Sequence, residues 1–167
     1  MKKIITLLAF SIGILSFAQS INIGKFEITM TNSKGKSLSN EENGIKVTYT
    51  PSEYFWKVEI ENNSTENVEI DWDKSTFNYQ KRVSKIVFNN TTKLLANQPK
   101  GKEIIPKGMT LKKEIYPLEY VSVMAPTISK SDIKRWGKSN YNINLQFIQG
   151  TKEFEIIGEF EATLKSK

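Results

Sequence analysis

Three acidic residues, Glu69, Asp71 and Asp73, are the side chains of this 167-residue sequence whose spacing first suggests chemistry. They occupy every second position, so an extended strand would place all three carboxylates on one face. Clustered carboxylate oxygens bind Ca²⁺, and two carboxyls at a controlled separation can hydrolyse a glycosidic bond. However, side chains at positions i and i+2 of a strand lie about 6–7 Å apart, and no calcium-loop motif accompanies them. A solvated polar face is the simpler interpretation, so no catalytic residue is assigned, and Asp71 and Asp73 stay as the metal candidates.

Aromatic rings outside the apolar phase of a strand suggest a second kind of chemistry, which is stacking on sugar faces. Trp56 and Trp72 are in phase with the apolar residues beside them, and this phase predicts that both belong to the core. Trp136 stands between Arg135 and Gly137, outside any alternating run, and is a better surface candidate. The candidate ligand-binding residues are Tyr54, Phe55, Arg135, Trp136 and Tyr141.

A cluster of basic residues surrounds Trp136, and its members are Lys130, Lys134, Arg135 and Lys138. A basic patch that contains an aromatic ring can hold an anionic polymer. Elsewhere in the chain the basic residues are dispersed among acids, with 24 Lys and Arg against 18 Asp and Glu. That distribution keeps a protein soluble and does not predict a nucleic-acid partner.

Two residue types are missing, and their absence excludes whole classes of enzyme. The chain has no Cys and no His. Without Cys there is no disulfide, no thiolate nucleophile and no thiolate metal site. Without His there is no imidazole base, no Ser-His-Asp triad and no His-based metal site. We therefore expect a non-enzymatic protein without cofactors.

Residues 1–18 have the three-part pattern of a secretory signal peptide. Two lysines precede an uncharged run of 12 residues, Ile4 to Leu15, and the small residues Ser16 and Ala18 mark a cleavage site. The run is shorter than the ~20 apolar residues that cross a bilayer. We expect cleavage after Ala18, leaving a single domain over 19–167 with 22 basic and 18 acidic residues and a formal net charge of +4. The pattern predicts a bacterial protein exported to the periplasm or the medium, with no membrane span and no lipid anchor.

Alternation of apolar and polar residues dominates the rest of the chain, and this is the pattern of half-buried β-strands. The alternation is clearest over residues 26–31, 45–49, 56–61, 68–73, 141–147 and 154–164. Roughly seven to nine short strands, without long helical patterns between them, predict an all-β protein built as an antiparallel two-sheet sandwich. One helical turn is expected near 129–136, capped by Ser129 or Ser131, with Ile133 and Trp136 on one face and Gly137 at its end.

Two turns predict which strands pair directly. The segment from Asn62 to Asn67 is rich in Asn and Ser, whose side chains bond their own backbone, so its flanking strands are expected to form a hairpin. The segment from Gln149 to Lys152 contains Gly150 and predicts a second hairpin between the last two strands. The loops expected at the ends of the sandwich are 34–44, 89–102 and 126–140.

Three stretches between Val58 and Pro117 form a recognisable series: two alternating runs around an Asn turn (VEIENNSTENVEIDW), an aromatic strand (STFNYQ), and an Ile-Pro-x-Gly turn that opens a strand (IIPKGMTLKKEIYP). This series resembles small immunoglobulin-like sandwich domains of exported bacterial envelope proteins. The resemblance implies an immunoglobulin-like fold. Because that architecture carries unrelated activities, it supplies no functional residue.

The sequence as a whole favours an exported, non-enzymatic binding module whose partner is a protein or a glycan of the cell envelope. Loops at the ends of the sandwich would carry its specificity. Two alternatives stay open at this point. One is a small carbohydrate-binding or glycan-active protein, and the other is an inhibitor of a secreted proteinase that presents one of these loops.

Overall fold

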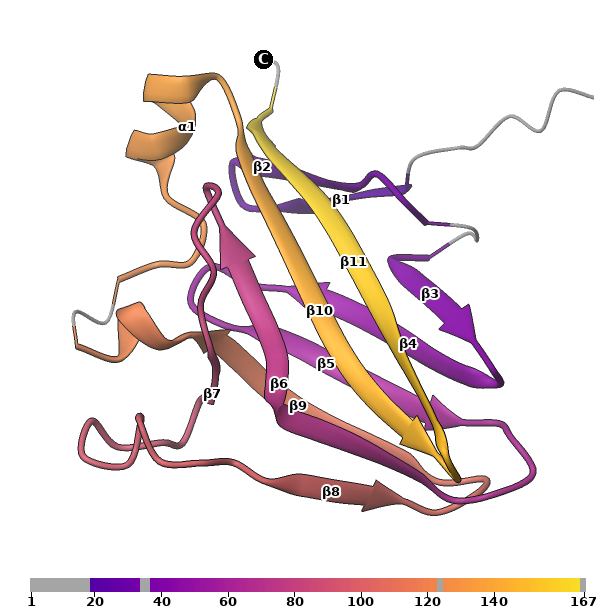
Figure 1. Cartoon of the computed structure of the whole chain (residues 1–167). Coiled ribbons are helices and arrows are strands. Elements are labelled where there is room, and N and C mark those ends of the chain that lie inside the picture. Colours follow the sequence, from indigo (N-terminus) through magenta and orange to yellow (C-terminus); the bar gives the residue numbers. More distant parts are fainter. Residues whose placement is uncertain (1–18, 34–36, 123–124, 166–167) are drawn as a thin grey trace, which may run out of the picture.

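Two antiparallel sheets pack face to face in the computed structural model, as Figure 1 shows. The structure describes residues 19–33, 37–122 and 125–165, so the predicted signal peptide over 1–18 lies outside the described residues. The first sheet has six strands, in the order β1 (Gln19–Ile23), β2 (Phe26–Met30), β11 (Lys152–Leu164), β10 (Ser139–Gln149), β6 (Val68–Tyr79) and β8 (Lys102–Ile105). The second has five, in the order β3 (Ser39–Glu42), β4 (Ile45–Pro51), β5 (Trp56–Asn62), β9 (Thr110–Pro117) and β7 (Ile86–Phe88).

This arrangement confirms the predicted all-β, two-sheet sandwich. The described residues contain eleven strands, which is more than the seven to nine expected. Strands β1, β3 and β8 account for much of the difference, because they are short edge strands with few buried residues. Strand β3 lies inside the loop that was expected over 34–44.

The core lies between the sheets and is built from the residues that alternation predicted to point inward. Trp56 and Trp72 are both buried, as expected. The Trp56 ring is in contact with rings from the opposite sheet, with centroids 5.5 Å from Phe77 and 4.8 Å from Phe160. Each large apolar side chain buried in this way contributes about 1.5–3 kcal/mol, and edge-on aromatic contacts add to that.

Gly158 in β11 leaves room for the Tyr49 ring, which comes from the facing sheet. A Cβ atom at this position would lie 2.8 Å from Cζ of Tyr49 and 2.7 Å from Cε2 of Phe160. Tyr49 is buried, and its ring centroid lies 5.1 Å from that of Phe160. The glycine is therefore required by packing rather than by a turn.

One predicted pairing is wrong, because β5 and β6 do not form a hairpin. Strand β5 pairs with β4 and β9 in the five-stranded sheet, whereas β6 pairs with β10 and β8 in the six-stranded sheet. The segment between them, residues 63–67, crosses from one sheet to the other. Strands β5 and β6 each have an apolar face that is buried in the same core. Because the chain crosses between the sheets, the two strands pack on that core from opposite sides.

Asn62 holds this crossing through its side-chain amide, which is fully buried. Its Nδ2 donates to the carbonyl oxygens of Glu66 (2.9 Å) and Ile105 (2.8 Å). Its Oδ1 accepts from the backbone N–H of Ser64 (3.1 Å) and from the Ser64 hydroxyl (2.6 Å). The turn chemistry predicted for this segment is present, but it stabilises a change of sheet.

The second predicted hairpin is confirmed. Strands β10 and β11 pair in register from Ser139↔Ala162 to Gln149↔Lys152. The two residues between them include Gly150, whose φ of 59° is left-handed. On its other side β10 pairs with β6, with Asn142 opposite Asn78. These three strands place the polar side chains that form the candidate site.

The predicted helical turn is also present, as α1 (Lys130–Trp136). The Ser129 hydroxyl caps it by accepting from the N–H of Asp132, and Gly137 ends it with a left-handed φ of 77°. Ile133 is its buried residue, whereas Trp136, expected on the same face, is 63% exposed. A 3₁₀ turn, η1 (Leu118–Ser122), is the other helical element in the described part of the chain. No helix among the described residues has the length and apolar character to cross a membrane.

Candidate functional site

Helix α1 and the end of β6 border a cavity of about 460 Å³, which we call the helix pocket. The exposed ring of Trp136 lies at its margin, with the guanidinium carbon of Arg135 5.0 Å from the ring centroid. The pocket is lined by Tyr79, Gln80, Lys81, Arg82, Asp132, Arg135, Trp136 and Asn140.

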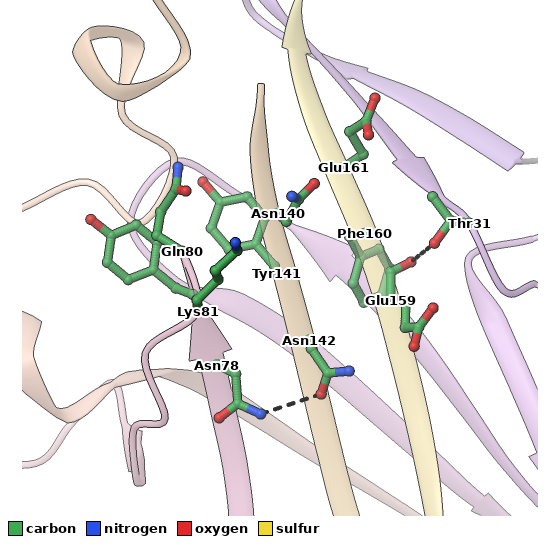
Figure 2. A pocket seen from close by; sticks show the side chains of 11 residues that line it. Thr31, Asn78, Gln80, Lys81, Asn140, Tyr141, Asn142, Glu159, Phe160 and Glu161 are labelled. Carbon is green, nitrogen blue, oxygen red and sulfur yellow. Dashed lines mark hydrogen bonds between the residues drawn. The ribbon is translucent and has the colours of Figure 1, made fainter. Parts of the chain in front are cut away.

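A second cavity, of about 380 Å³, lies where the ends of β6, β10 and β11 run side by side, and we call it the sheet pocket (Figure 2). It is lined by Thr31, Asn78, Tyr79, Gln80, Lys81, Asn140, Tyr141, Asn142, Glu159, Phe160 and Glu161. Four of these residues, Tyr79, Gln80, Lys81 and Asn140, also line the helix pocket. The two cavities therefore adjoin, and we refer to them together as the paired pockets.

The turn that follows β6 separates the two pockets and is strained. Gln80 and Lys81 have φ values of 49° and 65°, the left-handed region that usually takes Asn or Gly. The turn is closed by backbone bonds between Tyr79 and Arg82 of 3.0 and 2.8 Å. The Gln80 amide also donates to the hydroxyl of Ser139, at 2.9 Å. Strain that is held in place by surrounding bonds is characteristic of functional sites.

Tyr79 connects the helix pocket to the core beneath it. Its hydroxyl donates to Oδ2 of Asp132 at 3.3 Å, which ties α1 to β6. Its ring stacks on Tyr141, with centroids 6.2 Å apart, and lies 5.5 Å from Tyr120. Burial raises the pKa of both Tyr120 and Tyr141, so these phenols remain neutral hydrogen-bond donors at physiological pH.

The helix pocket is electropositive. Lys81, Arg82 and Arg135 line it, and none of the three is in an ion pair with another described residue. Asp132 is the acid in its lining, and it accepts a hydrogen bond from Tyr79. Three cations against one carboxylate favour an anionic group in this pocket.

The sheet pocket has a different chemistry, because amides and carboxylates line it. The amides are Asn78, Gln80, Asn140 and Asn142, and Asn78 Nδ2 donates to Oδ1 of Asn142 at 3.4 Å. Glu159 and Glu161 project from β11 on the same side as these amides, as Figure 2 shows. Amides both donate and accept hydrogen bonds, and carboxylates accept them, so this lining suits a ligand rich in hydroxyl groups.

The structure brings together two of the five candidate ligand-binding residues. Arg135 and Trp136 share the helix pocket. Tyr141 borders the sheet pocket but is only 3% exposed, and its hydroxyl donates to the carbonyl of Thr127 at 3.0 Å. Its ring therefore belongs to the core and offers no free face for stacking.

The remaining two candidates, Tyr54 and Phe55, lie between β4 and β5 and line neither of the paired pockets. Phe55 is partly buried, and its carbonyl accepts a bond from the N–H of Ser52 at 3.0 Å. Tyr54 is 58% exposed and borders a separate cavity of about 300 Å³ with Tyr116 and Tyr120. These two residues do not extend the paired pockets.

Asp71 and Asp73, the metal candidates, are engaged with the backbone instead. Asp71 is buried, and its Oδ1 accepts from the N–H groups of Asp73 and Lys74 across an irregularity in β6. Asp73 accepts from the N–H groups of Lys100 (2.8 Å) and Gly101 (2.9 Å), and these bonds lower its pKa. Among the residues that the structure describes, no group of three or more acidic side chains could hold a metal ion.

Loop 89–102 is pinned at its end by the same Asp73 carboxylate. The Lys100 ammonium folds back on it and donates to the carbonyls of Ala96 and Gln98, both at 2.7 Å. Leu94 precedes these anchors in the loop and protrudes, with 89% of its surface exposed. This loop presents an apolar side chain on a defined backbone.

Apart from Tyr141, sequence reasoning missed the residues of the sheet pocket. A signal was present, since four successive outward positions of β10 are amides, namely Asn140, Asn142, Asn144 and Gln146. The partners of these amides, however, come from segments far away in the chain. Comparison of the chain with protein-family models, with curated proteins and with solved structures finds no match.

Proposed function

We propose that this chain is an exported, non-enzymatic binding module, and that its ligand is a glycan held across the paired pockets. One observation carries the proposal. A tryptophan that is 63% exposed stands beside a cavity that adjoins a second cavity lined by amides and carboxylates. An exposed aromatic ring packs on the apolar face of a sugar, and neighbouring amides bind its hydroxyl groups.

Export rests on the predicted signal peptide. Cleavage after Ala18 would make Gln19 the first residue of the mature chain. Processing there leaves the described sandwich whole. Mass spectrometry of the protein recovered from the cell envelope or the medium tests this, and a mass that includes residues 1–18 would contradict it.

A glycan array tests the ligand, with Trp136→Ala as the site variant. Ile104→Ala is the matched control, because Ile104 is also exposed but lies on β8, outside the lining of both pockets. We expect the unsubstituted protein and the Ile104 variant to bind the same glycans and the Trp136 variant to lose them. Absence of binding to any glycan, or equal binding by the Trp136 variant, refutes the proposal.

A second candidate, a proteinase inhibitor, is favoured by the protruding Leu94. An exposed apolar residue on a pinned loop is the kind of anchor that a partner's pocket takes. A panel of secreted proteinases, assayed with the unsubstituted protein and with Leu94→Asp, tests this function separately. Inhibition that depends on Leu94 supports it, and inhibition of no enzyme excludes it for that panel.

A further inference from the structure

The charged residues that line the two pockets differ, and this difference indicates which class of glycan the pockets bind. We infer that the helix pocket binds the carboxylate of an acidic glycan, a polymer containing uronic acid, while the neighbouring sugar lies over the sheet pocket. This inference rests on the proposed function and adds to it the class of glycan and the place of its charged group.

The helix pocket has the groups needed for a charged sugar ring. Arg135 and Trp136 lie together, so one ligand ring could contact the indole while its carboxylate meets the guanidinium. Lys81 and Arg82 approach from the strained turn, and neither is paired with an acid among the described residues. Cations that are free of internal partners are available to an external anion.

The sheet pocket argues for a glycan over a nucleic acid. A phosphodiester chain carries a negative charge at every unit, and Glu159 and Glu161 would repel it. Glu161 is paired with Lys138, but Glu159 is in no ion pair among the described residues. A polymer in which a uronic acid alternates with a neutral sugar avoids this repulsion, because the uncharged unit presents hydroxyl groups that donate to a carboxylate and bind the amides of Asn140 and Asn142. Alternation between a cationic pocket and an amide pocket therefore matches a polymer that offers both carboxylates and hydroxyls.

The size of the cavities is consistent with such a ligand. They measure about 460 and 380 Å³, and small-ligand sites in proteins span about 300–1,000 Å³. Because the pockets share Tyr79, Gln80, Lys81 and Asn140, adjacent units of one chain can occupy both.

The test compares two probes that differ only in charge: an oligosaccharide in which glucuronate alternates with N-acetylglucosamine, and its fully methyl-esterified form. Intrinsic tryptophan fluorescence is a suitable signal, because Trp56 and Trp72 are buried and Trp136 is exposed. We expect the acidic probe to shift the emission and to bind at least tenfold more tightly than the ester. Its affinity should also fall as salt is raised, since the charged contact is at the surface.

Two variants assign the contact to the helix pocket. Arg135→Gln and Arg82→Gln each remove one cation that lines the helix pocket but not the sheet pocket, and each should weaken the acidic probe about fivefold or more while leaving the ester unchanged. Lys107→Gln is the control, because Lys107 is an exposed lysine outside both pockets and in no ion pair among the described residues. Circular dichroism is the check that all three variants fold.

The outcomes separate the inference from the proposed function. Equal affinity for the acid and the ester, with binding still lost in Trp136→Ala, overturns the inference and keeps a glycan-binding module. Tighter binding of single-stranded RNA than of the acidic probe overturns both. If the acidic probe fails to bind while neutral glycans on the array do, the assignment of charge is wrong.

Discussion

Replacement of Asn62 by alanine tests whether a single buried amide stabilises the crossing of the chain from one sheet to the other. Four hydrogen bonds end on this side chain. The carbonyl of Glu66 keeps a second donor, the Ser64 hydroxyl at 3.0 Å, so its loss is small. The bond to the Ile105 carbonyl is the buried one, and removing it costs more.

The size of the effect follows from these partners. Leaving a buried carbonyl without its donor costs about 1–3 kcal/mol, and each further hydrogen bond contributes about 1 kcal/mol. Asn62→Ala should therefore lower the free energy of unfolding by about 3–4 kcal/mol. Since small domains are stable by about 5–15 kcal/mol, the variant should fold but unfold at much lower urea concentration.

Urea unfolding followed by tryptophan fluorescence measures this loss, and Asn63→Ala is the matched control. Asn63 is the exposed neighbour, with the same side chain in the same turn, and its replacement should change stability by less than about 0.5 kcal/mol. Asn62→Asp adds a second test, because a carboxylate would face two carbonyl oxygens. That variant should be at least as unstable as Asn62→Ala at pH 7 and should recover as the pH falls, since protonation restores one donor. If Asn62→Ala loses less than about 1 kcal/mol or matches the Asn63 variant, the crossing is held by something else.

Three further perturbations have expected outcomes. Gly158→Ala places a methyl group against Tyr49 and should destabilise the fold by about 1–3 kcal/mol, measured by thermal unfolding; an unchanged midpoint would show that the Tyr49 ring moves freely. Lys81→Gly relieves a left-handed backbone, so its melting temperature should not fall, while its affinity for the acidic probe should drop; a clear loss of stability would mean that the turn is not strained. The pKa of Asp73 is lowered in the folded protein, so its bonds stabilise the fold above the unfolded-state pKa, and this contribution is lost as the pH falls through the folded-state pKa. The protection factor of the Gly101 N–H, which is the measured exchange rate corrected for the slower intrinsic exchange in acid, should therefore fall as the pH drops through that pKa, and in Asp73→Asn it should depend less on that titration.

The sandwich could be predicted from the sequence because strand alternation is a local signal. Each alternating run needs only its own residues to show which face is apolar, and Trp56 and Trp72 lie in the core for that reason. The pairing of strands is not local. The segment after Asn62 has the composition of a hairpin turn, but nothing within it specifies that β5 and β6 will join different sheets. That choice depends on β9 and β10, which follow much later in the chain.

The candidate site could be predicted in part, for the same physical reason. Trp136 and Arg135 were identified because they lie outside any strand. Tyr141 was among the candidate ligand-binding residues although it alternates with Asn140 and Asn142, and that alternation was the better guide, because the ring is buried. Gln80 could not be found, since its role depends on a left-handed turn placed beside β10 by strand register.

The paired pockets combine a rigid part and a weakly anchored part, and this combination bears on how a ligand would be held. Strands β6, β10 and β11 are bonded along their length, so the amides of the sheet pocket have fixed positions. Helix α1 has only seven residues, which is too short to be stable alone, and Ile133 is its one buried side chain. Its other tie to the strands is the bond from Tyr79 to Asp132. A ligand that contacts both Trp136 and the strand amides would add a further link between α1 and the sheet. The exposed Trp136 is thus on the weakly anchored helix, which a bound ligand would stabilise. The amides that orient the ligand are on strands whose positions are already fixed.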